Sequence, residues 1–272
     1  MMITSPANPK VKLVAGLQTS RRTRHREGRF VVEGRRLVQD ALVAGLAPDL
    51  VLHTPAWAAS SDGITLLQAI DGAGVASFAV SDELFELCSD TETPQGVLAV
   101  LPLPALAPPA APTLVVVVDR IRTPGNLGTI LRTAAAAGVE AVLLPPGNTD
   151  PFNPKVVRGA MGAHFRLPLV RLGWEETRAR LAGLAPWLAA AGAGERYDQV
   201  DWTRPVALII GGEAGGAGQE AETLAGGQVH IPMPGGMESL NAAVAAGVLL
   251  FEVVRQRSSP AGSRERLAPA SG

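Results

Sequence analysis

The uninterrupted apolar and β-branched run TLVVVV, residues 113–118, constrains the fold of this chain more than any other feature of the sequence. A strand with one solvated face shows alternating polarity, whereas a continuous run of this kind is typical of a strand buried on both faces of a parallel sheet. The run ends at Asp119 and leads into a turn containing proline and glycine. We therefore expect an α/β domain with helices on both faces of the sheet.

The sequence after this strand continues to alternate between strands and helices. We predict helices at residues 126–137 and 239–256, with Asn126 and Ser239 as their N-caps. This order gives an open, mostly parallel sheet, in which ligands bind at the carboxyl ends of the strands. The further strands are expected at residues 141–144, 166–170, 187–190, 206–210 and 228–232. One apolar stripe is predicted on the last helix, and it consists of Leu240, Val244, Gly247, Phe251 and Val254.

A segment rich in proline and alanine divides the chain. Residues 105–112 carry no charge, and their prolines prevent a helix, so we predict a semi-rigid linker. Residues 1–104 alternate short strands and helices, which indicates a smaller α/β/α domain. Residues 113–257 form the parallel-sheet domain, and the composition of residues 258–272 predicts a disordered tail.

The net charge of −1 conceals a strong asymmetry along the chain. Residues 1–40 contain nine Lys or Arg against three acidic residues, whereas residues 41–112 contain eight acidic residues and no Lys or Arg. Such a basic arm indicates a local contact with a polyanion, and a solvated helical face is the alternative. The candidate contacts are Lys10, Lys12, Arg21, Arg22, Arg24, Arg26 and Arg29. Lys155 and Arg158 either extend this track or are ordinary surface charges.

Cysteine and histidine usage excludes several classes of site. Cys88 is the single cysteine, so an intrachain disulfide and a multi-cysteine metal site are excluded. The four histidines have no metal-ligand spacing, and we expect no metal. No apolar run approaches the roughly 20 residues that span a bilayer, and no apolar signal core is seen, so we expect a cytoplasmic protein without a membrane partner.

Three loops after strands carry the candidate chemistry. In residues 119–133, Gly128 lies one helical turn before Arg132, and this spacing suggests room for a ligand beside the guanidinium. A surface arginine that pairs with a neighbour is the alternative. Residues 211–218 place Glu213 in a glycine-rich turn that fits neither the dinucleotide nor the P-loop fingerprint. Residues 230–247 contain an irregular Pro/Gly segment whose free backbone groups suit a polar ligand.

Together, the segments PGNLGTILRT, GGEAGG and MESLN resemble the three motifs of the SpoU (TrmH-like) family of RNA ribose 2′-O-methyltransferases, within the SPOUT superfamily. The segment NPKVVRGAMGAHFRLP resembles the family's link between its first two motifs. The N-terminal segments NPKVKLVAGL and RRTRHREGRFVVEG are similar to the substrate-binding domain of many members, which itself resembles ribosomal protein L30e.

The resemblance implies a deep trefoil knot, a homodimer and S-adenosylmethionine (AdoMet) as the methyl donor. The positions that match the family's catalytic or substrate-positioning residues are Asn126, Arg132, Glu213, Ser239 and Asn241. The positions that match its cofactor pocket are Gly211, Ile231 and Leu240. A guanidinium group is a very weak acid and holds its proton, so we expect Arg132 to bind the target phosphate or hydroxyl and not to act as a base.

The resemblance favours methylation of ribosomal RNA, because family members with this N-terminal domain usually act there. Transfer RNA is one alternative substrate, and a non-catalytic RNA-binding protein of the same fold is an alternative function. An NAD-type oxidoreductase is disfavoured by the missing fingerprint.

Overall fold

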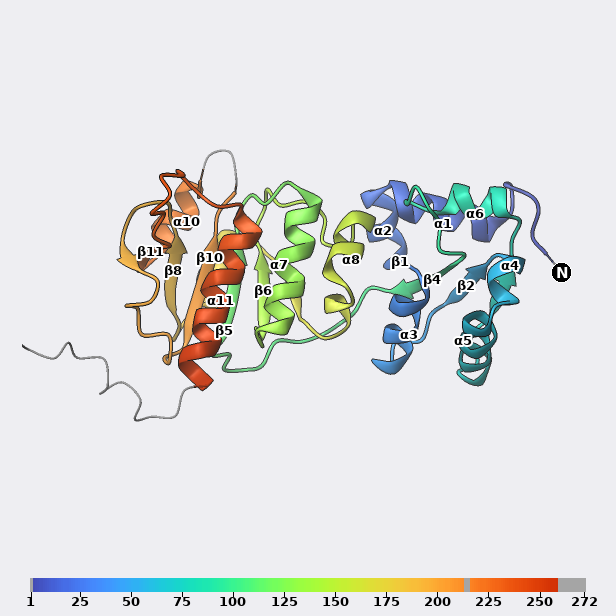
Figure 1. The fold of residues 1–272 in the computed structure, drawn as a ribbon, viewed down its shortest axis with the longest axis horizontal. Helices are drawn as coiled ribbons and strands as arrows, with labels where there is room; N and C mark the ends of the chain where they lie inside the picture. The colour runs from blue at the N-terminus through green and yellow to red at the C-terminus, as the bar shows by residue number, and fades with distance from the viewer. Residues whose placement is uncertain (1, 213–215, 259–272) are drawn as a thin grey trace, which may run out of the picture. The chain divides into compact units, whose positions relative to one another are not determined.

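A computed structural model describes residues 2–212 and 216–258, and it divides into two compact units (Figure 1). The first unit consists of Met1–Ala107, Thr123–Arg132 and Thr149–Pro168. The second consists of Pro108–Arg122, Thr133–Asn148 and Leu169–Gly272. The expected tail, residues 258–272, lies outside the described residues after Ser258.

The first unit is built, in its described residues, on a four-stranded sheet of order β1-β4-β2-β3. Strand β4 is antiparallel to both β1 and β2, and β2 is parallel to β3. The strands are β1 (Arg29–Glu33), β2 (Leu50–His53), β3 (Ser77–Ala79) and β4 (Val97–Pro102). The helices of the N-terminal part are α1 (Pro9–Thr19), α2 (Arg21–Glu27), α3 (Arg35–Val43), α4 (Pro55–Ala58), α5 (Ser61–Gly72) and α6 (Asp82–Cys88).

Successive residues of β1 enter different cores, because side chains alternate across a strand. Phe30 and Val32 pack in the cluster that contains residues of α3 and α5. Val31 packs in the other cluster, with residues of α1 and α6. Helices therefore cover both faces of this sheet, which confirms the expected α/β/α arrangement.

The segment Thr149–Pro168 completes the first unit with α8 (Pro154–Ala160) and the 3₁₀ helix η1 (Ala163–Phe165). The side chain of Asn153 accepts the backbone N–H of Lys155, and Pro154 occupies the first helical position, so Asn153 caps this helix. Phe165 packs in the same core cluster as Phe30.

The second unit contains, among its described residues, a seven-stranded sheet of order β7-β6-β5-β10-β8-β11-β9. Every registered pair in it is parallel. The strands are β5 (Leu114–Val118), β6 (Ala141–Leu144), β7 (Leu169–Arg171), β8 (Ala185–Ala189), β9 (Glu195–Arg196), β10 (Val206–Ile210) and β11 (Gly227–His230). The helices not yet given are α7 (Pro124–Ala136), α9 (Trp174–Arg180), α10 (Gln219–Leu224) and α11 (Ala242–Ser258).

The two central strands, β5 and β10, are buried at every residue, as the run at residues 113–118 predicts. They pair in register from Val206 with Leu114 to Ile210 with Val118. Their carboxyl ends therefore bring Asp119 and Gly211 to the same edge of the sheet. The predicted parallel-sheet fold is confirmed, whereas the trefoil knot stays a prediction.

The starts of two helices differ from the prediction. Helix α7 begins at Pro124, and the carbonyl of Thr123 accepts the N–H groups of Asn126 and Leu127. The predicted N-cap role of Asn126 is therefore wrong, because proline with its fixed φ already occupies the first helical position. Helix α11 begins at Ala242, so Ser239 lies before the helix and does not cap it.

The apolar stripe predicted on the last helix is not its buried face. Val244 and Phe251 are each 51% exposed, whereas the buried residues of α11 include Ala246, Leu249 and Val253. The buried face combines alanine, leucine and valine with the polar Glu252 and Gln256, so apolar side chains lie on both faces of the helix and their spacing did not identify the buried one. No helix in the described part of the chain is long and apolar enough to cross a membrane.

Candidate cofactor pocket

A cavity of about 250 Å³ lies at the carboxyl ends of β8, β10 and β11, in the second unit. Ala189, Ile210 and Val229 line it from these strands, and Leu249 lines it from α11. This is the edge of the sheet at which a parallel α/β topology places ligands.

The pocket brings together four of the predicted site residues. Gly211, Ile231, Ser239 and Leu240 all line it, although they lie in two loops that are separated in the sequence. A Cβ atom on Gly211 would lie 2.9 Å from the backbone N of Ala217, so only glycine allows this close approach of the chain. The four predicted site residues therefore share one cavity, and their role as cofactor and substrate contacts stays a prediction.

The chemistry of the walls is apolar with a few polar groups. Alanine, isoleucine, leucine, methionine and valine side chains alternate with glycine backbone. Among the described lining residues, Glu238 supplies the one carboxylate and Ser239 the one hydroxyl. Such a pocket suits a ligand that combines an apolar ring or chain with polar groups and positive charge.

Asn241 holds the start of α11 next to this pocket. Its Oδ1 atom accepts the N–H of Ala243 at 2.9 Å and that of Val244 at 3.3 Å. These N–H groups have no partner within the helix, so Asn241 is the N-cap that was predicted at Ser239. The side-chain oxygen of Asn241 is thus committed to the helix.

Two further predicted catalytic residues, Asn126 and Arg132, are not among the residues that line this cavity. Asn126 and Arg132 lie on the part of α7 that belongs to the first unit, and the Arg132 side chain is exposed. Among residues 2–212 and 216–258, Arg132 forms no ion pair. Glu213 lies outside the described residues.

Gly128 does not serve the purpose predicted for it. It is buried, and a Cβ atom there would lie 2.8 Å from the carbonyl oxygen of Val156 and 3.0 Å from the Cα of Gly159. The glycine lets α7 and α8 pack closely, so it does not leave room for a ligand beside Arg132.

The sequence reasoning missed one wall of the pocket. Residues 190–192, the AAG segment after β8, line it together with Met233. This segment follows the end of a strand, which is where a parallel sheet places its ligand site. It was missed because residues 190–192 contain no charged or hydroxyl side chain.

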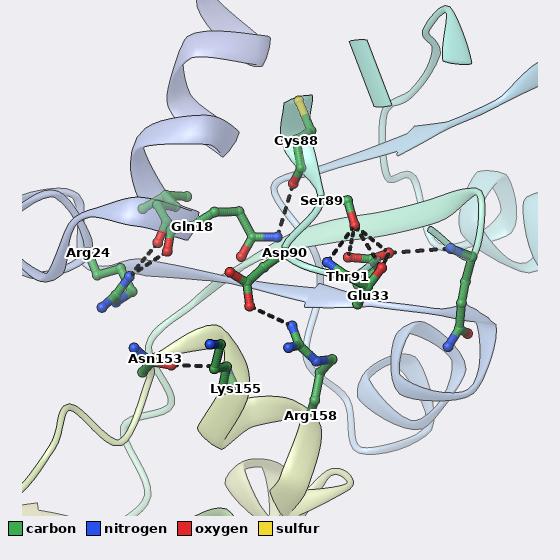
Figure 2. Close-up of polar contacts among 12 residues, drawn as sticks. Gln18, Arg24, Glu33, Cys88, Ser89, Asp90, Thr91, Asn153, Lys155 and Arg158 are labelled. Carbon is green, nitrogen blue, oxygen red and sulfur yellow. Dashed lines mark hydrogen bonds and ion pairs between the residues drawn. The ribbon is translucent and has the colours of Figure 1, made fainter. Parts of the chain in front are cut away.

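The basic residues of the first unit have different environments. Arg24 is buried and forms an ion pair with Asp150, and its Nη1 donates to the carbonyl of Leu17 at 2.6 Å. Figure 2 shows its guanidinium directed at backbone oxygens of α1. The prediction that Arg24 contacts RNA is therefore wrong, because its charge is neutralised inside the protein.

The other candidates stay at the surface. Arg26 pairs with Glu27, Arg29 pairs with Asp49, and Lys10 lies over the ring of Phe78. Three further exposed cations form no ion pair in the described part of the chain, and these are Lys12, Arg21 and Arg22. They are the members of the arm most available to a polyanion.

Lys155 and Arg158 also differ from each other (Figure 2). Lys155 is exposed on the first turn of α8, whereas Arg158 is half-buried and pairs with Asp90 at 2.8 Å. Lys155 is therefore the better candidate for a phosphate contact.

Two buried titratable groups are poor candidates for catalysis. Burial raises the pKa of the Cys88 thiol to about 11, so the reactive thiolate is suppressed. Burial likewise lowers the pKa of His164 to about 4, and its Nε2 lies 2.7 Å from the carbonyl of Pro151. The described residues contain no group of three or more His, Cys, Asp or Glu that could hold a metal ion.

The open parallel sheet, with an apolar pocket at its strand ends, defines an α/β protein that binds a small organic ligand. The model of the SpoU rRNA Methylase family matches residues 113–251. The chain belongs to this family. Residues 8–99 match the MRM3-like substrate binding domain.

Relatives and solved structures agree with this assignment. The chain is 34% identical to the 23S rRNA (guanosine(2553)-2′-O)-methyltransferase RlmP of Bacillus subtilis, over 92% of this chain and 98% of that protein. It is also 34% identical to a 23S rRNA (uridine(2479)-2′-O)-methyltransferase of Streptomyces viridochromogenes, over 93% of this chain and 91% of that protein. The crystal structure of an AdoMet-bound rRNA methyltransferase from Sinorhizobium meliloti superposes with a TM-score of 0.83 at 30% identity, covering 95% of this chain and 99% of that one.

Proposed function

We propose that this protein transfers a methyl group from AdoMet to a ribose 2′-hydroxyl of ribosomal RNA. The observation that carries the proposal is the strand-end pocket, in which two loops with SpoU motifs meet. The similar structure from Sinorhizobium meliloti is that of an AdoMet-bound rRNA methyltransferase, and the two relatives described above are 23S rRNA 2′-O-methyltransferases.

The pocket has the properties that AdoMet requires. Its apolar walls suit the adenine ring, its glycine backbone offers hydrogen bonds, and the Glu238 carboxylate suits a cationic ligand. Gly211, Ile231 and Leu240 would hold the cofactor. When bound, AdoMet supplies a methyl group that is already activated by its sulfonium.

The protein must then position the ribose oxygen and help to remove its proton. A ribose hydroxyl is a very weak acid, so it needs a strongly polarising neighbour. In our proposal Arg132 binds the target phosphate or hydroxyl through its guanidinium, and a phosphate oxygen accepts the proton. Glu213 orients Arg132 or a ribose hydroxyl, and Asn126, Ser239 and Asn241 fix the loops and the substrate.

In the proposed function, one domain binds the RNA substrate and the other transfers the methyl group. Residues 1–104 act as the RNA substrate-binding domain, and residues 113–257 act as the methyltransferase domain behind the linker 105–112. The exposed cations Lys12, Arg21 and Arg22 support this role for the first domain. Phosphate contacts of this kind supply affinity and register, but they do not read the base.

A homodimer is part of the proposal. Met237, Leu240, Val244 and Phe251 expose large apolar side chains on α11 and the segment before it, at 70, 36, 51 and 51%. Apolar surface at this density marks an interaction site, and a second copy of this chain is the expected occupant. Sedimentation should give a dimer for the wild type and a monomer for Phe251→Asp. A wild type that sediments as a monomer would contradict the proposal.

Binding and transfer assays separate this function from its alternatives. Calorimetry should show binding of AdoMet and none of NAD. Transfer of labelled methyl groups should favour ribosomal RNA over transfer RNA. Preferred labelling of transfer RNA would support transfer RNA as the substrate. A protein that does not bind AdoMet, or that transfers no methyl group to either RNA, would be a non-catalytic RNA-binding protein. Localisation in the cytoplasm stays a prediction, which fractionation of cells tests.

A further inference from the structure

We infer that Asp119 and Arg120, which do not line the pocket, are positioning residues for its glycine-rich wall. This inference rests on the proposed function, since that wall belongs to the proposed AdoMet pocket. The wall belongs to the loop of residues 211–218, which follows β10. Among the described residues of this loop, Gly211, Gly212, Gly216 and Ala217 line the cavity.

Asp119 is fixed in place at the end of β5. Its backbone N–H donates to the carbonyl of Ile210 at 2.9 Å, and its side chain is almost completely buried. Its Oδ2 atom accepts the N–H of Gly218 at 2.6 Å. A buried carboxylate of this kind ties the far end of the loop to the centre of the sheet.

Arg120 holds the same loop from a second side. Its Nη2 atom donates to the carbonyl of Gly216 at 3.1 Å, and its Nε atom lies 3.5 Å from Oδ2 of Asp119. A Cβ atom added at Gly212 would lie only 2.7 Å from the carbonyl oxygen of Arg120, so the two backbone segments approach each other closely. Two adjacent residues therefore hydrogen-bond the far end of the loop at Gly216 and Gly218, and the backbone of Arg120 lies close to its near end at Gly212.

The backbone at Arg120 supports a specific role. Arg120 has φ of +54°, a left-handed conformation that is unfavourable for a residue with a side chain and free of strain for glycine. A chain that needed only a turn here would be served better by glycine. The arginine side chain, which reaches Gly216, explains why the strained residue is tolerated.

Loss of these hydrogen bonds should leave the loop free before the ligand binds, and ordering it would then oppose binding. We expect Arg120→Gly to raise the KM for AdoMet about tenfold, with little change in kcat or in the KM for RNA. Its melting temperature should stay at or above that of the wild type, because glycine relieves the positive φ. A merely structural residue would lower stability and affinity together.

Substitutions of Asp119 provide the second variant. Asp119→Asn keeps an oxygen that can accept the N–H of Gly218, so its affinity for AdoMet should stay near that of the wild type. Asp119→Ala removes that acceptor and should weaken binding as Arg120→Gly does. Arg204→Ala is the matched control, because Arg204 is an exposed arginine whose side chain pairs only with Asp201 among the described residues.

The experiment is calorimetry with AdoMet on the wild type and these variants, with thermal unfolding and steady-state kinetics. Weaker binding by Arg120→Gly at wild-type stability, with Asp119→Asn close to the wild type, supports the inference. Unchanged binding by Arg120→Gly and Asp119→Ala overturns it and leaves the proposed function standing. Affinity lost only together with stability also overturns it. A wild type that does not bind AdoMet overturns both.

Discussion

Arg24 and Asp150 form a buried ion pair, with Nη2 and Oδ2 2.8 Å apart and side chains only 4 and 5% exposed. The pair joins α2 to the segment before α8, which lie 126 positions apart in the sequence. The basic arm therefore contains one cation that belongs to the core of the first unit and others that face solvent.

This difference predicts opposite behaviour for two arginines two positions apart. Arg24→Ala leaves the carboxylate of Asp150 buried without its partner, which costs about 3–5 kcal/mol in comparable pairs. Arg22→Ala removes an exposed charge and should change stability by less than about 0.5 kcal/mol. Urea unfolding followed by circular dichroism measures both. A stable Arg24→Ala protein that has lost RNA affinity would contradict this division.

The exposed cations should control the salt dependence of RNA binding. Replacing Lys12, Arg21 and Arg22 with alanine removes three phosphate contacts, so the plot of log affinity against log salt should become shallower by about 2. Filter binding between low and moderate salt measures the slope. Arg204→Ala, an exposed arginine of the second unit, should leave it unchanged. An unchanged slope in the triple variant would show that the arm does not hold RNA.

Arg132 should be required for transfer but not for cofactor binding. Arg132→Ala should lower turnover to background while calorimetry gives an AdoMet affinity within about threefold of the wild type. Arg132→Lys keeps the charge but loses the guanidinium fork, so it should restore little activity. Near-normal methylation by Arg132→Ala would refute the proposed role.

Asn241 should affect both α11 and the reaction, and two substitutions separate these effects. Asn241→Ala leaves the N–H groups of Ala243 and Val244 without their acceptor and should cost about 1 kcal/mol of stability. Asn241→Asp keeps an N-cap and should restore stability. If it restores full methylation as well, the role of Asn241 is the cap alone; if activity stays low, the amide also acts on substrate.

Stability should depend on pH through His164. Burial lowers its pKa to about 4 from an ordinary 6.5, although a hydrogen bond to Pro151 and the nearby Asp150 raise it. Between about pH 6.5 and pH 4, His164 is therefore protonated in the unfolded chain and neutral in the folded protein. The free energy of unfolding should fall by up to about 3 kcal/mol as the pH drops through this range. Urea midpoints across this range should show the slope. His164→Phe should reduce it, and an identical slope in that variant would assign the effect to other groups.

The sequence predicted the central sheet because its signals are local. The runs that become β5 and β10 are buried on both faces, which is typical of strands in a parallel sheet covered by helices. The residues that share the pocket were identified by resemblance, since no local rule connects Gly211 with Leu240.

What the sequence could not predict depends on tertiary contacts. Arg24 has the same local pattern as Arg22, and only the distant Asp150 makes it a core residue. Gly128 serves a helix contact with Gly159 that no spacing reveals. The buried face of α11 combines alanine, leucine and valine side chains with Glu252 and Gln256, so the predicted stripe with Val244 and Phe251 is not the buried one.

The most direct test of the proposed reaction is alkaline hydrolysis of unmodified ribosomal RNA after incubation with the protein and methyl-labelled AdoMet. A methylated 2′-oxygen cannot attack the adjacent phosphate, so the label should appear in alkali-resistant dinucleotides. Label recovered in mononucleotides would show base methylation, and an absence of label would show no transfer. Either result would contradict ribose 2′-O-methylation by this protein.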